Sequence, residues 1–254
     1  MAVHVFDTMG TTVSLRFAGT LPDSTVLHAV QAGFDDYDRR FSLYRPDSEL
    51  SRIARGDLAL RHASAVLRDS YADALEWRSL TAGAFTPHRP DGVIDLNGIV
   101  KASAMAAAAD LLDTAGETDW LLNAGGDILG RGALAGAPWS IGITDPADRA
   151  GLLCALTLSG DRCAVATSGT AERGEHIWRH DPQPHGAASV YRQVTVRAAD
   201  IVTADVLATA ILAGGGEHLD DVTARFPIDV LTVAADGEIT ATPRLQHTRG
   251  LAPA

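Results

Sequence analysis

The stretch that organises this chain runs Asp95-Leu-Asn-Gly-Ile-Val-Lys101 and continues without a break into an alanine-rich run that ends at Leu112. Asn97 and Gly98 favour a tight turn, and alanine is the strongest helix former. We therefore predict a turn that feeds directly into the N-terminus of a helix.

A helix N-terminus of this kind can bind an anion. Its first N–H groups have no partners within the helix, and the helix dipole is positive at that end. Lys101 in the first turn adds a full positive charge, so the segment favours phosphate. In the alternative interpretation, Asp95 or Asn97 merely caps the helix and Lys101 is a solvated surface charge. The segment is compatible with both.

The overall charge narrows the possible partners. The 254 residues carry a formal net charge of −11, whereas nucleic acid and anionic membranes bind basic faces. The first ten residues lack a basic region followed by a long apolar run, and no apolar segment is long enough to span a membrane. We therefore expect no nucleic-acid binding, no membrane insertion and a cytoplasmic location. Cys154 and Cys163 are predicted to be small buried thiols, because they lack the spacing of a zinc site.

Apolar periodicity predicts alternating strands and helices. Strands are expected at 3–6, 11–17, 120–122, 139–143, 152–158, 163–167, 190–196, 228–234 and 239–241, and helices at 21–37, 66–80, 104–112 and 201–212, with a short helix after Ser48. Glycines at 214–216 should end the 201–212 helix. The segment 168–189 is a long loop of the kind that is usually functional or disordered, and the tail from about 243 to 254 is expected to be loose. No repeat or linker interrupts the sequence, so one α+β domain over residues 1–254 is predicted.

Two positions in the 201–212 helix have the chemistry of a metal site. Asp205 and Thr209 are four residues apart and share one helix face. A carboxylate, a hydroxyl and a loop carbonyl form the hard-oxygen set that magnesium binds, together with water and substrate phosphate. Alternatively, Asp205 only complements the helix dipole and Thr209 packs in the core.

His176 is a candidate base in the long loop. An unperturbed histidine has a pKa of about 6.5, which suits proton transfer near neutral pH. Because the chain has nine histidines, most of them must have no such role.

Eight short motifs follow one another along nearly the whole chain. They are Met9-Gly-Thr-Thr, Ser42-Leu-Tyr-Arg-Pro-Asp-Ser-Glu-Leu-Ser-Arg52, Gly83-Ala-Phe-Thr-Pro87, Asp95–Lys101, Asn123-Ala-Gly-Gly-Asp127, Ala166-Thr-Ser-Gly169, His176-Ile177 and Ala204-Asp-Val-Leu-Ala-Thr209. In this order and spacing they resemble the motifs of the FAD:protein FMN transferases, the ApbE-type flavin transferase family.

The resemblance implies a fold, a reaction and a set of partners. The fold would be a single α+β domain related to the T-fold, with antiparallel or mixed β-sheets packed against helices. The reaction would use FAD as substrate and Mg²⁺ as cofactor, join FMN through its phosphate to a Thr or Ser hydroxyl of an acceptor flavoprotein, and release AMP.

The resemblance also implies roles for individual residues. The metal ligands would be Asp205, Thr209 and the Gly98 carbonyl, with assistance from the Ala208 carbonyl. FAD would be bound by Met9, Tyr44, Ala84, Phe85, Thr86, Asp95, Lys101 and Ile177. The catalytic residues would be Asp205, Lys101 and His176, the last as base for the incoming hydroxyl.

The sequence also departs from the family pattern. Only eight residues, 87–94, separate Phe85-Thr86 from Asp95, where family members usually carry a longer insert, so the pocket is expected to be more open. His180 competes with His176 as base. The family's usual lipoprotein signal is missing, which favours the cytoplasmic form. Two alternatives stay open: an FAD diphosphatase that gives FMN and AMP, and a flavin-binding module without catalysis. Manganese and calcium suit the same oxygen donors as magnesium. The acceptor protein and the oligomeric state are not identified by these residues.

Overall fold

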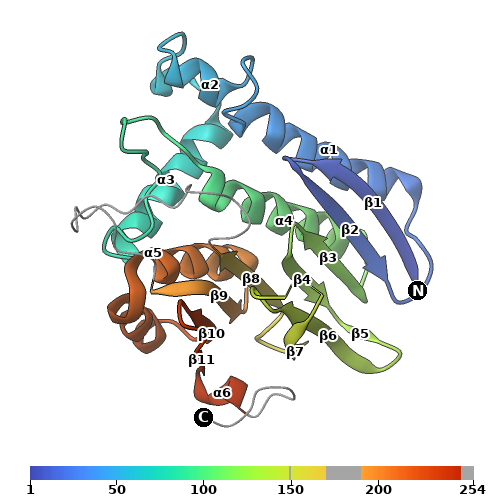
Figure 1. Cartoon of the computed structure of the whole chain (residues 1–254). Helices are drawn as coiled ribbons and strands as arrows, with labels where there is room; N and C mark the ends of the chain where they lie inside the picture. Colours follow the sequence, from blue (N-terminus) through green and yellow to red (C-terminus); the bar gives the residue numbers. More distant parts are fainter. Residues whose placement is uncertain (149, 170–189, 247–254) are drawn as a thin grey trace.

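The computed structural model describes residues 1–148, 150–169 and 190–246. In these ranges the chain forms one α+β fold, in which long helices lie against a large antiparallel sheet (Figure 1). The helices are α1 (Ser24–Phe41), α2 (Glu49–Ala54), α3 (Ala65–Leu80), α4 (Asn97–Thr114), α5 (Ile201–Arg225) and α6 (Pro243–Gln246), and one 3-10 turn spans Leu60–His62. None of the helices in these ranges has the length and apolar character that crossing a membrane requires.

The strands form two sheets. They are β1 (Ala2–Thr8), β2 (Thr11–Phe17), β3 (Trp120–Ala124), β4 (Asp127–Arg131), β5 (Ala133–Leu134), β6 (Ala137–Thr144), β7 (Leu152–Leu158), β8 (Ala164–Gly169), β9 (Tyr191–Ala198), β10 (Asp229–Ala234) and β11 (Ile239–Ala241). The larger sheet has the order β1-β2-β3-β4-β8-β9-β10-β11, and the smaller has the order β5-β6-β7. Every ladder between these strands is antiparallel.

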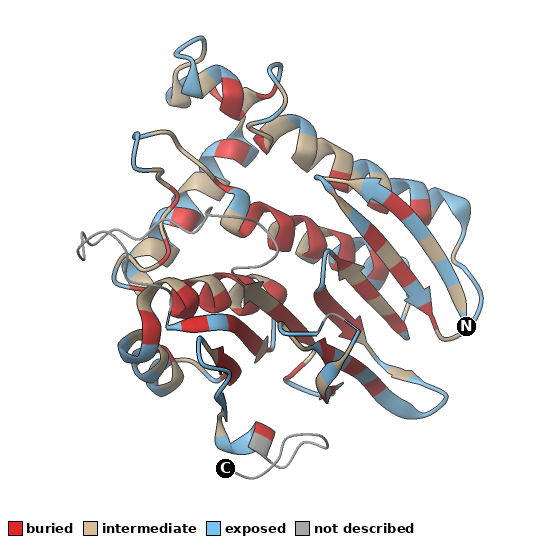
Figure 2. Ribbon diagram, in the orientation of Figure 1, coloured by how far each residue is buried: buried red, intermediate tan, exposed pale blue. Residues whose placement is uncertain are grey.

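The core has a layer on each face of the large sheet. On one face, apolar residues of the sheet pack against α1, α4 and α5. On the other face, Ile128, Val165 and Leu231 pack against the inner side of β6 and β7. Central strands such as β4 and β10 are therefore buried on both faces, whereas the edge strand β1 leaves Val3 and Val5 exposed (Figure 2).

Most of the predicted elements are confirmed, with small shifts at their ends. The opening hairpin turns at Met9 and Gly10, so β1 is longer than expected. Ser48 caps α2 by accepting a hydrogen bond from the Ser51 amide at 2.9 Å. The strands expected at 228–234 and 239–241 pair as β10 and β11, and the turn at Asp236-Gly237 joins them.

Three predictions about local structure are wrong. The helix from Ile201 does not end at the glycines: Gly215 (φ 72°) kinks it, and helix continues to Arg225. The start of the supposedly loose tail forms α6, in which Leu245 is fully buried against β10 and β11. Cys163 is only half-buried, although Cys154 is buried as expected.

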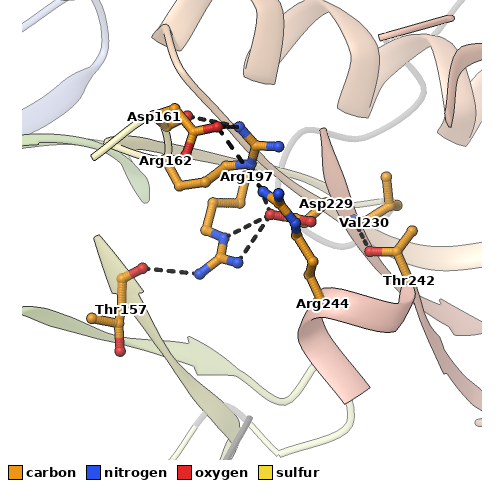
Figure 3. Close-up of polar contacts among 8 residues, drawn as sticks. All are labelled: Thr157, Asp161, Arg162, Arg197, Asp229, Val230, Thr242 and Arg244. Carbon is orange, nitrogen blue, oxygen red and sulfur yellow. Dashed lines mark hydrogen bonds and ion pairs between the residues drawn. The ribbon is translucent and has the colours of Figure 1, made fainter. Parts of the chain in front are cut away.

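A buried cluster of charged residues holds the two sheets together (Figure 3). The Asp229 carboxylate on β10 accepts hydrogen bonds from Arg162 Nε at 2.9 Å and from Arg197 Nη2 at 2.9 Å. Arg197 Nη1 also donates to the Thr157 carbonyl on β7 at 3.0 Å, which links β9 to the small sheet. Both guanidinium groups are largely buried, and Asp229 is the buried carboxylate that they share. Arg162 also pairs with the exposed Asp161 at 2.7 Å.

We predict that Asp229→Ala lowers the free energy of unfolding by about 3–5 kcal/mol, because it removes the buried carboxylate that pairs with both buried guanidinium groups. Urea denaturation followed by circular dichroism measures the change. Asp161→Ala is the matched control: Asp161 contacts the same Arg162 but is exposed, so a change below about 1 kcal/mol is expected. Equal losses in the two variants would contradict the role assigned to Asp229.

Candidate functional site

A cleft of about 940 Å³ opens where six parts of the chain meet. They are the β1–β2 turn, the end of α1 with the segment after it, the segment before α4, the first turns of α4, the middle of α5, and the end of β8. The turn between β3 and β4 adds Gly125 to the lining. The cleft is large enough for a ligand of nucleotide size.

The first turn of α4 forms one wall. Asp95 Oδ1 accepts a hydrogen bond from the Asn97 amide at 3.0 Å, while the N-cap position itself is Leu96, whose side chain makes no capping bond. Gly98 follows, and a Cβ at this position would lie 2.9 Å from the ring of Phe85. Glycine thus lets the buried Phe85 ring pack directly on the helix start.

Lys101 is not the solvated surface charge of the alternative interpretation. Its residue is 7% exposed, and its ammonium pairs with Asp127, which is 1% exposed. Asp127 begins β4 directly after Gly125 and Gly126, whose φ values of 60° and 95° allow a tight turn between β3 and β4. This turn therefore places a carboxylate beneath the cleft, where it neutralises Lys101.

Asp205 and Thr209 come from α5, on the opposite wall. Both line the cleft with Gly98, and Asp205 is buried. Asp205 lies beyond the first turn of α5, whose N-cap is Asp200. The alternative interpretation, in which Asp205 only complements the dipole at the start of the helix, therefore does not fit its position. The Thr209 hydroxyl lies 3.1 Å from the Ser168 hydroxyl at the end of β8.

The structure brings together most of the residues that the sequence singled out. Those that line the cleft are Met9, Tyr44, Ala84, Phe85, Thr86, Asp95, Gly98, Lys101, Asp205 and Thr209. Ala208 is fully buried within α5 and is not part of the lining. His176, Ile177 and His180 lie outside the described residues.

Sequence reasoning assigned no role to several residues that belong to this site. Tyr37, Asp38 and Arg45 line the mouth, where Arg45 pairs with Asp38 at 3.3 Å. Burial, with help from Asp36 and Asp73, raises the pKa of Tyr37, so its phenol stays protonated and can donate a hydrogen bond. Tyr37 and Asp38 lie in the last turns of an amphipathic helix and Arg45 lies just after it, so the apolar periodicity of the sequence gave no sign of their place in the cleft.

The charge balance of the cleft bears on which ligands fit. Its described lining contains the carboxylates of Asp38, Asp95 and Asp205 but only two cations, Arg45 and Lys101. Both cations already face a carboxylate. A diphosphate would therefore meet too little positive charge from these residues alone.

A divalent cation fits this imbalance. Asp205, Thr209 and Gly98 line one cleft. A carboxylate, a hydroxyl and a backbone carbonyl are the kinds of oxygen donor that magnesium sites use, completed by phosphate and water. The described residues contain no group of three or more His, Cys, Asp or Glu side chains that would hold a metal by itself. A metal in this cleft would thus complete its coordination with water, with backbone or hydroxyl oxygens and, when substrate is bound, with phosphate.

Comparison with known proteins shows the family to which this chain belongs. The ApbE family model matches residues 9–89 and 86–232. The FAD:protein FMN transferase of Rhodobacter capsulatus is 31% identical over 187 residues, which are 69% of this chain and 35% of that protein. The enzyme of the same name from Salmonella typhimurium is 28% identical over 164 residues, 59% of this chain and 45% of that protein. The matched region is thus less than half the length of either relative.

Solved structures agree with the family match. The ApbE protein of Thermotoga maritima superposes with a TM-score of 0.78 at 22% identity, covering 96% of this chain and 98% of that one. The flavinyl transferase ApbE of Pseudomonas stutzeri, in its apo form, gives 0.78 at 22% identity, covering 99% and 97%. The fold is therefore that of ApbE proteins, and the chain belongs to the ApbE family.

We predict that Asp127→Asn lowers the free energy of unfolding by about 3 kcal/mol, because the substitution leaves the Lys101 ammonium buried without its counter-ion. Chemical denaturation measures the change. Asp113→Asn is the matched control: this exposed acid pairs with Arg131 at 3.4 Å, and its loss should cost less than about 1 kcal/mol. Adding Lys101→Met to Asp127→Asn should restore part of the stability, and a further loss in the double variant would overturn the prediction.

Proposed function

We propose that this protein transfers the FMN part of FAD to a Thr or Ser hydroxyl of an acceptor flavoprotein, with Mg²⁺ as cofactor and AMP as the second product. Family membership and the names of the curated relatives support this reaction. One structural observation carries it furthest: the start of α4 and the Asp205–Thr209 face of α5 line a single cleft of nucleotide size.

In the proposed reaction, the acceptor oxygen attacks the phosphorus of the FMN phosphate. The bond from that phosphorus to the bridging oxygen of the diphosphate breaks, and AMP leaves with the bridging oxygen. The hydroxyl proton passes to a base, for which His176 is the candidate, with His180 as its competitor. Such a transfer depends mainly on positioning and on neutralising charge.

The residues of the cleft have distinct parts in this proposal. Asp205, Thr209 and the Gly98 carbonyl would hold Mg²⁺, which would neutralise phosphate charge when bound. Lys101 and Asp95 would bind FAD at the start of α4, and Met9, Tyr44, Ala84, Phe85, Thr86 and Ile177 would surround the rest of it. Ala208 would contribute only its backbone carbonyl, because its side chain is fully buried.

The reaction is tested by incubating the protein with FAD, Mg²⁺ and a flavoprotein subunit that carries an acceptor Thr or Ser. We expect the acceptor to gain the mass of FMN and AMP to appear, and we expect a chelator to abolish both. Mass spectrometry of the acceptor and chromatography of the nucleotides measure them. AMP formation that is unaffected by the chelator would contradict the metal-dependent mechanism.

We predict that Asp205→Ala reduces AMP formation by at least about 100-fold, because it removes the only carboxylate among the proposed ligands. Initial rates at saturating FAD measure the effect. Glu217→Ala is the control, since Glu217 is an exposed acid on the same helix and outside the cleft. A fully active Asp205→Ala variant would contradict the role assigned to Asp205, whereas FAD binding without AMP formation by the unsubstituted protein would favour a flavin-binding module without catalysis.

Hydrolysis of FAD to FMN and AMP is the second candidate, and the short segment before α4 favours it. Residues 87–94 fold back on themselves: His88 bridges Ile94, and the Asp95 amide donates to the Pro87 carbonyl at 2.8 Å. None of these eight residues lines the cleft, so water has a route to the phosphates there. Free FMN in the presence of excess acceptor would identify hydrolysis as the main reaction.

A further inference from the structure

The hydroxyl of Thr209, in the middle of α5, pairs with a residue outside its own helix. Serine and threonine side chains within helices commonly bond to the carbonyl four residues earlier. In this structure Ser103 and Thr223 do so, with distances of 3.0 and 2.7 Å to the carbonyls of Ile99 and Leu219, as does Thr81 at the end of α3, with 2.8 Å to the Trp77 carbonyl. Thr209 instead pairs across the cleft with Ser168 Oγ at 3.1 Å. Its oxygen is therefore turned away from its own helix and toward β8.

Ser168 is held firmly enough to fix that direction. It lies in β8, next to Thr167, whose amide donates to Asp127 Oδ1 at 3.2 Å. The Thr167 hydroxyl lies 2.9 Å from the Thr195 hydroxyl on β9. The strand end is thus tied on one side to the acid that pairs with Lys101 and on the other side to the sheet. Ser168 and Thr209 both line the cleft.

The chemistry of a metal-bound hydroxyl explains what this contact does. An alcohol oxygen that binds a cation must point a lone pair at it, so its proton has to be donated elsewhere. If Thr209 donated its proton to a carbonyl of α5, the helix would fix the orientation of the hydroxyl. Ser168 instead provides an acceptor on β8 for the same proton. Residues that orient metal ligands in this way typically change metal affinity by about 10–100-fold when they are substituted.

We infer that Ser168 is a positioning residue of the metal site. It accepts a hydrogen bond from the Thr209 hydroxyl and so directs a lone pair of the Thr209 oxygen toward the divalent cation. This inference deepens the proposed function and rests on it. It assigns Ser168 no contact with FAD and no part in proton transfer. Its effect passes through Thr209 alone.

Mn²⁺ binding without FAD tests the inference directly, with electron paramagnetic resonance measuring the free ion. We expect Ser168→Ala to weaken Mn²⁺ binding by about 10–100-fold and Ser168→Thr, which keeps the hydroxyl, to restore most of it. Ser103→Ala removes a hydroxyl that bonds within α4 outside the cleft and should bind Mn²⁺ like the unsubstituted protein. Circular dichroism and thermal denaturation establish that each variant is folded.

A double variant separates positioning from a merely structural contact. If Ser168 acts through Thr209, then Ser168→Ala/Thr209→Val should bind Mn²⁺ no more weakly than Thr209→Val alone. Additive losses, or unchanged Mn²⁺ binding in a folded Ser168→Ala, would overturn the inference while leaving the proposed reaction standing. A protein that binds no Mn²⁺ with Ser168 and Thr209 intact would overturn both this inference and the metal site on which it rests.

Discussion

The close packing of α4 against α5 is the constraint on which the rest of the structure depends. Both helices carry alanines where they are most deeply buried, among them Ala102, Ala108, Ala204 and Ala208. Small side chains let two helices and a sheet approach one another with little intervening volume. As a result the first turn of α4 and the middle of α5 line one cleft, although the two segments are far apart in sequence.

Burial then determines the electrostatics of the cleft. Lys101 lies so far inside that it needs a counter-ion, and the β3–β4 turn supplies Asp127. The pair holds the helix start to the sheet, but it also removes most of the positive charge that the lysine would offer to a phosphate. A ligand with a diphosphate is therefore better matched to this cleft when it arrives with a divalent cation. The same Asp127 also binds the Thr167 amide and so connects Lys101 to the strand that carries Ser168.

Sequence patterns predicted the elements well where their signals were local. Ser48 located the start of α2, and the strands expected at 228–234 and 239–241 pair as the final hairpin. The glycines at 214–216 gave a wrong helix end. Gly215 has a non-helical backbone conformation that kinks α5, but the helix continues after it. α6 was missed because a four-residue helix is stabilised by burying Leu245, and burial of that kind cannot be read from so short a segment.

In the candidate site too, residues within short motifs were predictable, whereas residues defined by long-range contacts were not. The motif series placed Gly98, Lys101, Asp205 and Thr209, and all four line one cleft. Asp127 and Ser168 acquired roles only from the structure, since their contacts join strands and helices separated by tens of residues. No periodicity records such pairings, because they depend on the order of strands in the sheet.

Anomalous diffraction from crystals grown with Mn²⁺ and FAD tests the central claim most directly, that α4 and α5 together hold a cation on the phosphates of a dinucleotide. The expected result is one strong peak within about 2.5 Å of the Asp205 carboxylate and the Thr209 hydroxyl, with a diphosphate oxygen as a further ligand. FAD bound in the cleft with no metal between these groups and the phosphates would contradict it.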